Sequence, residues 1–153
     1  MHQTHAHKEQ ERLKLNSRLA DLALVKPWVD ALASEHAIGE DTVYKIELCL
    51  EEALSNIVRH GYKGEPQHRI ELSFHSNGDR MLRFAIEDNA PHFNQAGPGR
   101  KRAAKNTEDL IPGGHGMPLI RKFSSSVAWE PLPNGNRLTL TFPNEPRETD
   151  TRS

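Results

Sequence analysis

Residues 46–62 read IELCLEEALSNIVRHGY, and the apolar positions of this segment have the spacing of an α-helix that is buried along one side. Apolar residues recur every three or four positions, at Val43, Ile46, Leu50, Ala53 or Leu54, and Ile57. The pattern predicts a central helix that packs in the core. The lone cysteine, Cys49, lies beside this apolar stripe and is expected to be buried and unreactive.

A polar stripe made of Glu52, Asn56 and His60 follows one margin of the same helix, because residues four apart lie on one side. An amide oxygen is a hard, neutral metal ligand, and a carboxylate one turn earlier can accept a proton. This pair therefore suits a magnesium–nucleotide site. Polar residues beside an apolar stripe are also common on an ordinary solvated helix margin, so the motif E-x-x-x-N alone leaves both interpretations open.

The segment before the central helix is predicted to hold a strand over 12–17 and a helix that begins close to Pro27. The apolar residues of that helix fall on one side, at Leu22, Val25, Val29 and Leu32. Gly39 is expected to end it, and Asp41 is expected to cap the central helix.

After the central helix, period-two alternation predicts two strand pairs, 70–74 with 82–86 around Asn77-Gly78, and 127–129 with 138–142 around Asn134-Gly135. Between the two pairs, residues 95–112 are polar and without periodicity, which is unusual for a loop of this length unless it is functional or disordered. A short apolar helical segment begins at Met117.

Composition limits the class of protein without naming it. A chain of 153 residues with 35% hydrophobic content fits one domain, and a formal net charge of −1 disfavours a nucleic-acid partner. A single cysteine cannot form an intrachain disulfide, and a reducing compartment is the simpler interpretation. The sequence has neither the run of about 20 apolar residues that spans a bilayer nor a secretion signal, so we expect a cytoplasmic protein that does not bind membranes.

Two further motifs are each weak alone. Asp88 ends a predicted strand and is followed by the small residue Ala90, so its carboxylate suits the exocyclic amine of adenine, although Asp-Asn at a strand end is most often a plain turn. The run Gly113-Gly114-His115-Gly116 precedes a helix and suits phosphate binding, or is merely a flexible loop. Basic residues in the preceding loop are either phosphate contacts or simply solvated: Lys101, Arg102 and Lys105.

In this order, Glu52-x-x-x-Asn56, Asp88-x-Ala90-x-x-Phe93 and Gly113-Gly114-His115-Gly116 resemble the asparagine box and the two glycine boxes of the GHKL superfamily of ATP-binding domains. The segments EALSNIVRHGY, from Glu52, and GNRLTL, from Gly135, look most like the anti-sigma-factor serine kinases. The resemblance covers residues 12–143. The flanking segments 1–11 and 144–153 are polar and without periodicity, and we expect them to be disordered tails.

The resemblance implies ATP and Mg²⁺ as cofactors and assigns roles by position. Asn56 would be the metal ligand, Glu52 the catalytic base and Asp88 the adenine contact, and residues 95–112 would form the nucleotide lid. The other implied nucleotide-binding positions are His60, Ala90, Phe93, Lys105, Gly113, Gly114, His115, Gly116, Met117 and, at the adenine side, Thr139. Ala90 stands where the family usually has glycine, which would weaken binding if its backbone needed a positive φ.

The implied fold is an α/β two-layer sandwich, the Bergerat fold, with a mixed, mostly antiparallel sheet and helices on one face. The implied function is partner switching: the protein sequesters a sigma factor or similar effector and phosphorylates a serine or threonine of a small antagonist protein. The resemblance also suggests a homodimer. Two alternatives stay open. One is a nucleotide-dependent binding module without kinase activity, and the other is a stand-alone histidine-kinase catalytic domain.

Overall fold

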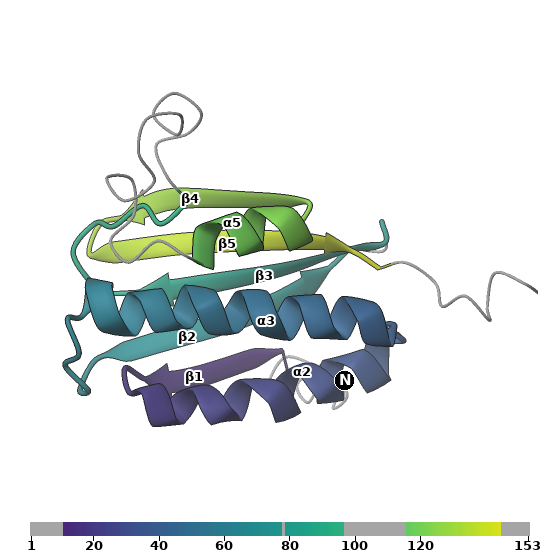
Figure 1. The fold of residues 1–153 in the computed structure, drawn as a ribbon, viewed down its shortest axis with the longest axis horizontal. Coiled ribbons are helices and arrows are strands. Elements are labelled where there is room, and N and C mark those ends of the chain that lie inside the picture. The colour runs from purple at the N-terminus through teal and green to yellow at the C-terminus, as the bar shows by residue number, and fades with distance from the viewer. Residues whose placement is uncertain (1–10, 78, 97–115, 145–153) are drawn as a thin grey trace, which may run out of the picture.

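A computed structural model describes residues 11–77, 79–96 and 116–144 (Figure 1). The elements in chain order are β1 (Arg12–Asn16), the 3-10 helix η1 (Leu19–Leu24), α2 (Val25–His36), α3 (Glu40–Asn56), the π-helix η2 (Ile57–Gly61), β2 (Arg69–Ser76), β3 (Met81–Asp88), α5 (Gly116–Phe123), β4 (Ser126–Leu132) and β5 (Gly135–Pro143). No helix in these ranges is both long and apolar enough to cross a bilayer.

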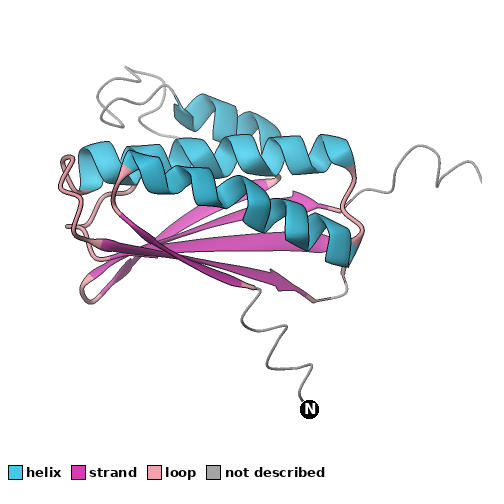
Figure 2. Cartoon of the chain, turned by 90° about the horizontal axis from the view of Figure 1, so that it is seen from below, coloured by secondary structure: helices cyan, strands magenta, loops and turns pink. Residues whose placement is uncertain are grey.

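The strands form one sheet in the order β1-β2-β3-β5-β4, and α2, α3 and α5 cover the same face of it (Figure 2). This arrangement confirms the expected two-layer α/β fold. Every pairing between described strands is antiparallel, whereas the resemblance implies a mixed, mostly antiparallel sheet. One reason lies in the connections, because α2 and α3 run side by side in opposite directions between β1 and β2, so the chain enters β2 antiparallel to β1 (Figure 1).

The core lies between α3 and the middle of the sheet. The inward side chains of β2 and β3 are fully buried, and they alternate with partly exposed residues as the sequence predicted: Ile70, Leu72, Phe74, Leu82, Phe84 and Ile86. On α3, Ile46, Cys49, Leu50 and Ala53 are equally buried. Each fully buried side chain of leucine or phenylalanine size stabilises the fold by about 1.5–3 kcal/mol.

The ends of the first two α-helices differ from the sequence prediction. The α2 helix ends at His36, and Ala37 takes the left-handed conformation with φ 54°. Gly39 instead precedes α3 as its N-cap, with no side-chain cap hydrogen bond. Asp41 lies inside the first turn beside Glu40, where a negative charge still interacts favourably with the helix dipole.

The described domain extends one residue beyond each expected boundary. The Glu11 carbonyl accepts a hydrogen bond from Phe74 N at 3.0 Å, and Asn144 N donates to the Arg80 carbonyl at 2.7 Å. Glu11 and Asn144 therefore belong to the sheet region and not to the tails. The rest of the expected tails, 1–10 and 145–153, and the turn residue Gly78 lie outside the described residues.

Candidate functional site

The candidate site lies where the end of the central helix meets the end of β3. At Ile57 the α3 helix passes into η2, and a Cβ built on the last η2 residue, Gly61, would lie only 3.3 Å from the Cβ of Ala90. The hydroxyl of the next residue, Tyr62, accepts a hydrogen bond from Asn89 N at 2.6 Å. The helix that carries the predicted polar stripe and the loop that follows Asp88 are therefore in contact.

Asp88 is the last residue of β3 and is only 6% exposed. Its Oδ1 accepts hydrogen bonds from Ala90 N at 2.9 Å and from Asn136 Nδ2 at 2.8 Å. Burial raises the pKa of Asp88, and these two hydrogen bonds partly oppose that shift. Because both described donors reach Oδ1, the other oxygen, Oδ2, is left for a donor from a ligand.

Asn136, on β5 directly opposite Asp88, is a site residue that the sequence analysis missed. Its Nδ2 also donates to the carbonyls of Ala90 and Pro91, at 3.2 and 3.1 Å. Its Oδ1 accepts from Phe93 N at 2.8 Å and from the indole Nε1 of Trp129 at 2.9 Å. One buried amide thus fixes the whole turn after Asp88. The sequence does contain one sign of this role: Asn136 is a polar residue at a position that shares its strand face with the buried Leu138 and Leu140.

The structure does not bring Thr139 to Asp88. Thr139 pairs with Ala85 in the sheet, and it alternates with the buried residues Leu138 and Leu140. Because side chains alternate along a strand, Thr139 lies on the face of the sheet opposite to Asp88. On β5 it is Asn136, and not Thr139, that contacts the Asp88 side chain.

Ala90 fits its position without backbone strain. The described non-glycine residues with positive φ are Ala37, Lys63 and Arg80, and Ala90 is not among them. Its methyl group is buried against the space left by Gly61, and the half-buried ring of Phe93 borders the same space. The alanine in the first glycine box therefore carries no penalty from φ.

Asn56 is 5% exposed at the end of α3, and it is bound to a residue of the segment that follows β3. Asn56 Nδ2 donates to Gln95 Oε1 at 3.1 Å, and Gln95 Nε2 donates to the Ala53 carbonyl at 3.3 Å. Glu52 and His60, one turn before and one turn after Asn56, are half-buried. Asn56 is therefore more deeply buried than a residue at a helix margin.

The structure describes the first two positions of the expected lid. Gln95 and Ala96 are both buried, and the Ala96 carbonyl accepts a hydrogen bond from the guanidinium of Arg121 on α5. These two residues are thus fixed between α3 and α5. The remaining lid positions, with Lys105, Gly113, Gly114 and His115, lie outside the described residues, and Gly116 and Met117 are the first two residues of α5.

The two polar groups fit the implied ligands. Asp88 Oδ2 can accept from an exocyclic amine, and Asn56 retains its amide oxygen for a hard cation. A magnesium ion that is held mainly by phosphates and water needs only one or two protein ligands. The described residues hold no cluster of three or more His, Cys, Asp or Glu side chains placed to bind a metal.

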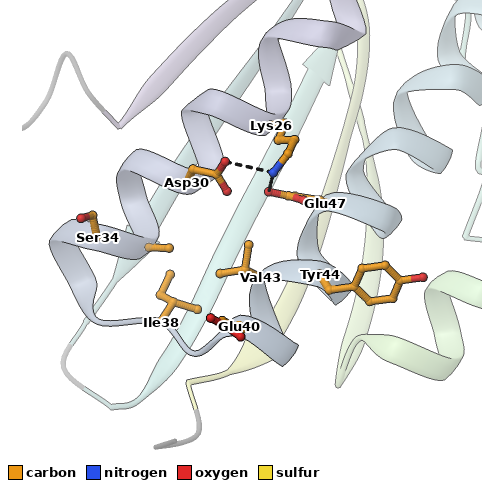
Figure 3. A pocket seen from close by; sticks show the side chains of 9 residues that line it. Lys26, Asp30, Ser34, Ile38, Glu40, Val43, Tyr44 and Glu47 are labelled. Carbon is orange, nitrogen blue, oxygen red and sulfur yellow. Dashed lines mark hydrogen bonds and ion pairs between the residues drawn. The ribbon is translucent and has the colours of Figure 1, made fainter.

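A separate pocket of about 430 Å³ opens between α2 and α3 (Figure 3). The Lys26 ammonium contacts the carboxylates of Asp30 at 3.1 Å and Glu47 at 3.8 Å in this pocket. Glu47 and Asn56 are nine residues apart, which is about 180° around a helix. The pocket is therefore on the other side of α3 from the candidate site.

Comparison with known proteins gives a consistent result. The family model described as the histidine kinase-like ATPase domain matches residues 15–142. The chain is 28% identical over 119 residues to Serine/threonine-protein kinase BtrW of Bordetella bronchiseptica, which covers 78% of this chain and 83% of BtrW. It is 24% identical over 121 residues to Serine-protein kinase RsbW of Listeria innocua, which covers 75% of each protein.

A solved structure has a similar fold. The crystal structure of the RsbU and RsbW domains of Rv1364c from Mycobacterium tuberculosis superposes with a TM-score of 0.59 at 16% identity. The match covers 89% of this chain and 32% of that longer chain. At this identity the likeness concerns the fold alone.

Proposed function

The chain belongs to the histidine kinase-like ATPase family, as its ordered motifs indicated, and we propose that it is a protein serine/threonine kinase of the partner-switching type. In this proposal it binds ATP with Mg²⁺ and phosphorylates a small antagonist protein. It also sequesters a sigma factor or an equivalent effector. The names of the two relatives, both protein kinases, support the reaction class.

One observation carries the proposal. A buried carboxylate with one oxygen left for a ligand, Asp88, and a buried carboxamide, Asn56, lie on two segments that meet at Gly61 and Ala90. The first group suits the amine of adenine, and the second suits a cation that accompanies phosphates. A nucleotide is a ligand that needs both groups at once.

Three residues have defined tasks in this mechanism. Asp88 accepts a hydrogen bond from the adenine amine, and Asn56 offers its amide oxygen on the phosphate side. Glu52 accepts the proton of the attacking serine or threonine hydroxyl as the new O–P bond forms and the bond to the leaving ADP oxygen breaks. Mg²⁺, when bound, neutralises charge on the phosphates.

The test of this proposal compares Glu52→Gln with Glu51→Gln. Glutamine keeps the size of Glu52 but cannot accept the proton, so phosphoryl transfer to the antagonist should fall by about 10²–10⁴-fold while ATP binding persists. Glu51 is the adjacent, exposed carboxylate, and its substitution should leave transfer nearly unchanged. Transfer is measured with γ-labelled ATP, and ATP binding by calorimetry.

The alternatives predict different results. A phosphoprotein label that is lost in acid would identify a histidine kinase, since phosphoserine and phosphothreonine survive acid. ATP binding without any transfer by the wild type to its antagonist would identify a binding module. Equal transfer by the wild type and Glu52→Gln would exclude Glu52 as the base.

A further inference from the structure

Gln95 connects the candidate metal ligand to the helix backbone. It is 2% exposed, and the two ends of its amide have different partners on α3. Its Oε1 accepts from Asn56 Nδ2 at 3.1 Å, and its Nε2 donates to the Ala53 carbonyl at 3.3 Å. Both partners belong to the last turn of the helix, immediately before the π-helix.

These contacts determine which way the Asn56 amide faces. A backbone carbonyl can only accept, so the Gln95 atom that faces Ala53 must be the NH₂ group. The Gln95 atom that faces Asn56 is then the oxygen, which can only accept, so Asn56 must present its own NH₂ group to it. The Asn56 Oδ1 is therefore directed away from Gln95.

The Ala53 carbonyl, which accepts the hydrogen bond from Gln95, lies where the helix type changes. Where α3 passes into η2, the Ile57 N–H is shared between the carbonyls of Ala53 and Leu54. The Tyr62 N–H, five residues beyond Ile57, donates to the Ile57 carbonyl at 2.8 Å. A backbone carbonyl oxygen has two lone pairs, so the Ala53 oxygen can accept from the Gln95 amide in addition to this shared N–H.

We infer that Gln95 is a positioning residue that holds the Asn56 side chain with its oxygen, and not its NH₂ group, toward a nucleotide-bound metal. This inference rests on the proposed function, because it needs a metal at Asn56. Mg²⁺ accepts oxygen ligands, so an Asn56 amide free to turn over would present the wrong group part of the time. Residues that orient a metal ligand typically change metal affinity or activity by about 10–100-fold when replaced.

The test replaces Gln95 with methionine, which has a similar length and no amide. Calorimetry with ATP is performed across a series of Mg²⁺ concentrations. For Gln95→Met we expect the Mg²⁺ concentration at half-maximal enhancement of binding to rise by about 10–100-fold. The affinity for ATP measured in EDTA should stay at the wild-type value, because Asp88 is untouched.

Ser17→Ala is the matched control. The Ser17 hydroxyl is buried, donates to the Glu65 carbonyl and accepts from His68 N at 3.1 Å, so this variant also loses one donated and one accepted hydrogen bond. Ser17→Ala should lower the thermal unfolding temperature without moving the Mg²⁺ midpoint. An unchanged midpoint in Gln95→Met, or an equal shift in both variants, would overturn the role of Gln95.

A second measurement uses only the wild-type protein without ATP, so it does not depend on whether Gln95→Met folds. In the wild type without ligand, NMR should show the Asn56 side-chain NH₂ exchanging with solvent at least about 10-fold more slowly than that of the exposed Asn134. Equal exchange rates would disprove the Gln95–Asn56 contact. If Asn56 exchanges slowly but the wild type shows no Mg²⁺-dependent ATP binding, the proposed function is overturned, and with it the role of Asn56 as a metal ligand.

Discussion

At the scale of single residues, Ala90 and Gly61 form a complementary pair. A methyl group stands at residue 90, where the family usually has glycine. It is accommodated because residue 61, across the contact, has no side chain. The effect of either substitution should therefore depend on the other residue.

We predict that Gly61→Ala destabilises the protein, and that it destabilises less when Ala90 is replaced by glycine. The added Cβ would lie 3.3 Å from the Ala90 Cβ, which is tighter than ordinary van der Waals contact. Contacting residues in a double-mutant cycle typically couple by about 0.5–3 kcal/mol. Urea denaturation of the two single variants and the double variant measures this coupling.

Gly64→Ala provides the control for this cycle. Gly64 has φ +83° and no atom within 4 Å of an added Cβ, so alanine there strains only the backbone. Its effect should add to that of Ala90→Gly within about 0.5 kcal/mol. If the effect of Gly61→Ala also adds to that of Ala90→Gly, the side chains at residues 61 and 90 do not compete for the same space.

At the scale of secondary structure elements, the close approach of β5 to the end of β3 places the Asp88 carboxylate. A Cβ on Gly135 would lie 1.8 Å from the backbone oxygen of Asp88, so only glycine allows this approach. The same approach lets Asn136 reach the Asp88 side chain.

Gly135→Ala should therefore destabilise the protein by about 3 kcal/mol or more, the upper end of the range for overpacking, because backbone cannot yield as a side chain can. ATP affinity should also fall in the fraction that remains folded, since the ends of β3 and β5 must separate. Thermal unfolding and calorimetry measure the two effects. Asn134→Ala, at the exposed neighbouring residue, is the control. A loss of stability in Gly135→Ala as small as that in Asn134→Ala would refute this account.

Most elements of this fold are predictable from local pattern. Alternation along β2 and β3 and the three- and four-residue spacing along α3 each depend on residues close in the chain. The helix ends were predicted less well, because Ala37 adopts the left-handed conformation where Gly39 was the obvious candidate. The π-helix also has no signal in the spacing of its residues.

The site was only partly predictable, for a physical reason. Asp88 and Asn56 belong to motifs with a recognisable chemistry. Asn136 acquires its role from Asp88, 48 positions away, through the register of β3 with β5. Gln95 acquires its role from Asn56, 39 positions away, through the packing of the segment after β3 on α3. Local sequence patterns contain neither of these relations.

At the scale of the whole molecule, the two long helices meet at an acidic contact that makes folding pH-dependent. Burial, together with the neighbouring Asp30 carboxylate, raises the pKa of Glu47 from 4.5 to about 7, although Lys26 opposes the shift. The folded protein therefore retains a proton that the unfolded chain releases between these two pH values. It follows that this group destabilises the fold as the pH rises from 4.5 to about 7.

We predict that Glu47→Gln makes the free energy of unfolding less dependent on pH in this window, since glutamine stays neutral. Urea denaturation at several pH values between about 5 and 7 would show a smaller decrease than in the wild type. Glu40→Gln is the control, because Glu40 lines the same pocket but is exposed. Identical pH profiles for the wild type and Glu47→Gln would contradict the prediction.

The hydrogen bond from Trp129 to Asn136 allows the candidate site to be observed by intrinsic tryptophan fluorescence. The protein has two tryptophans, and the other, Trp28, lies in the core with its ring 6.0 Å from that of Phe84. The Trp129 indole is one hydrogen bond from the amide that holds Asp88, so a ligand that shifts Asn136 changes the surroundings of only one of the two fluorophores. The unmodified chain thus contains both an optical reporter of the site and an internal reference for it.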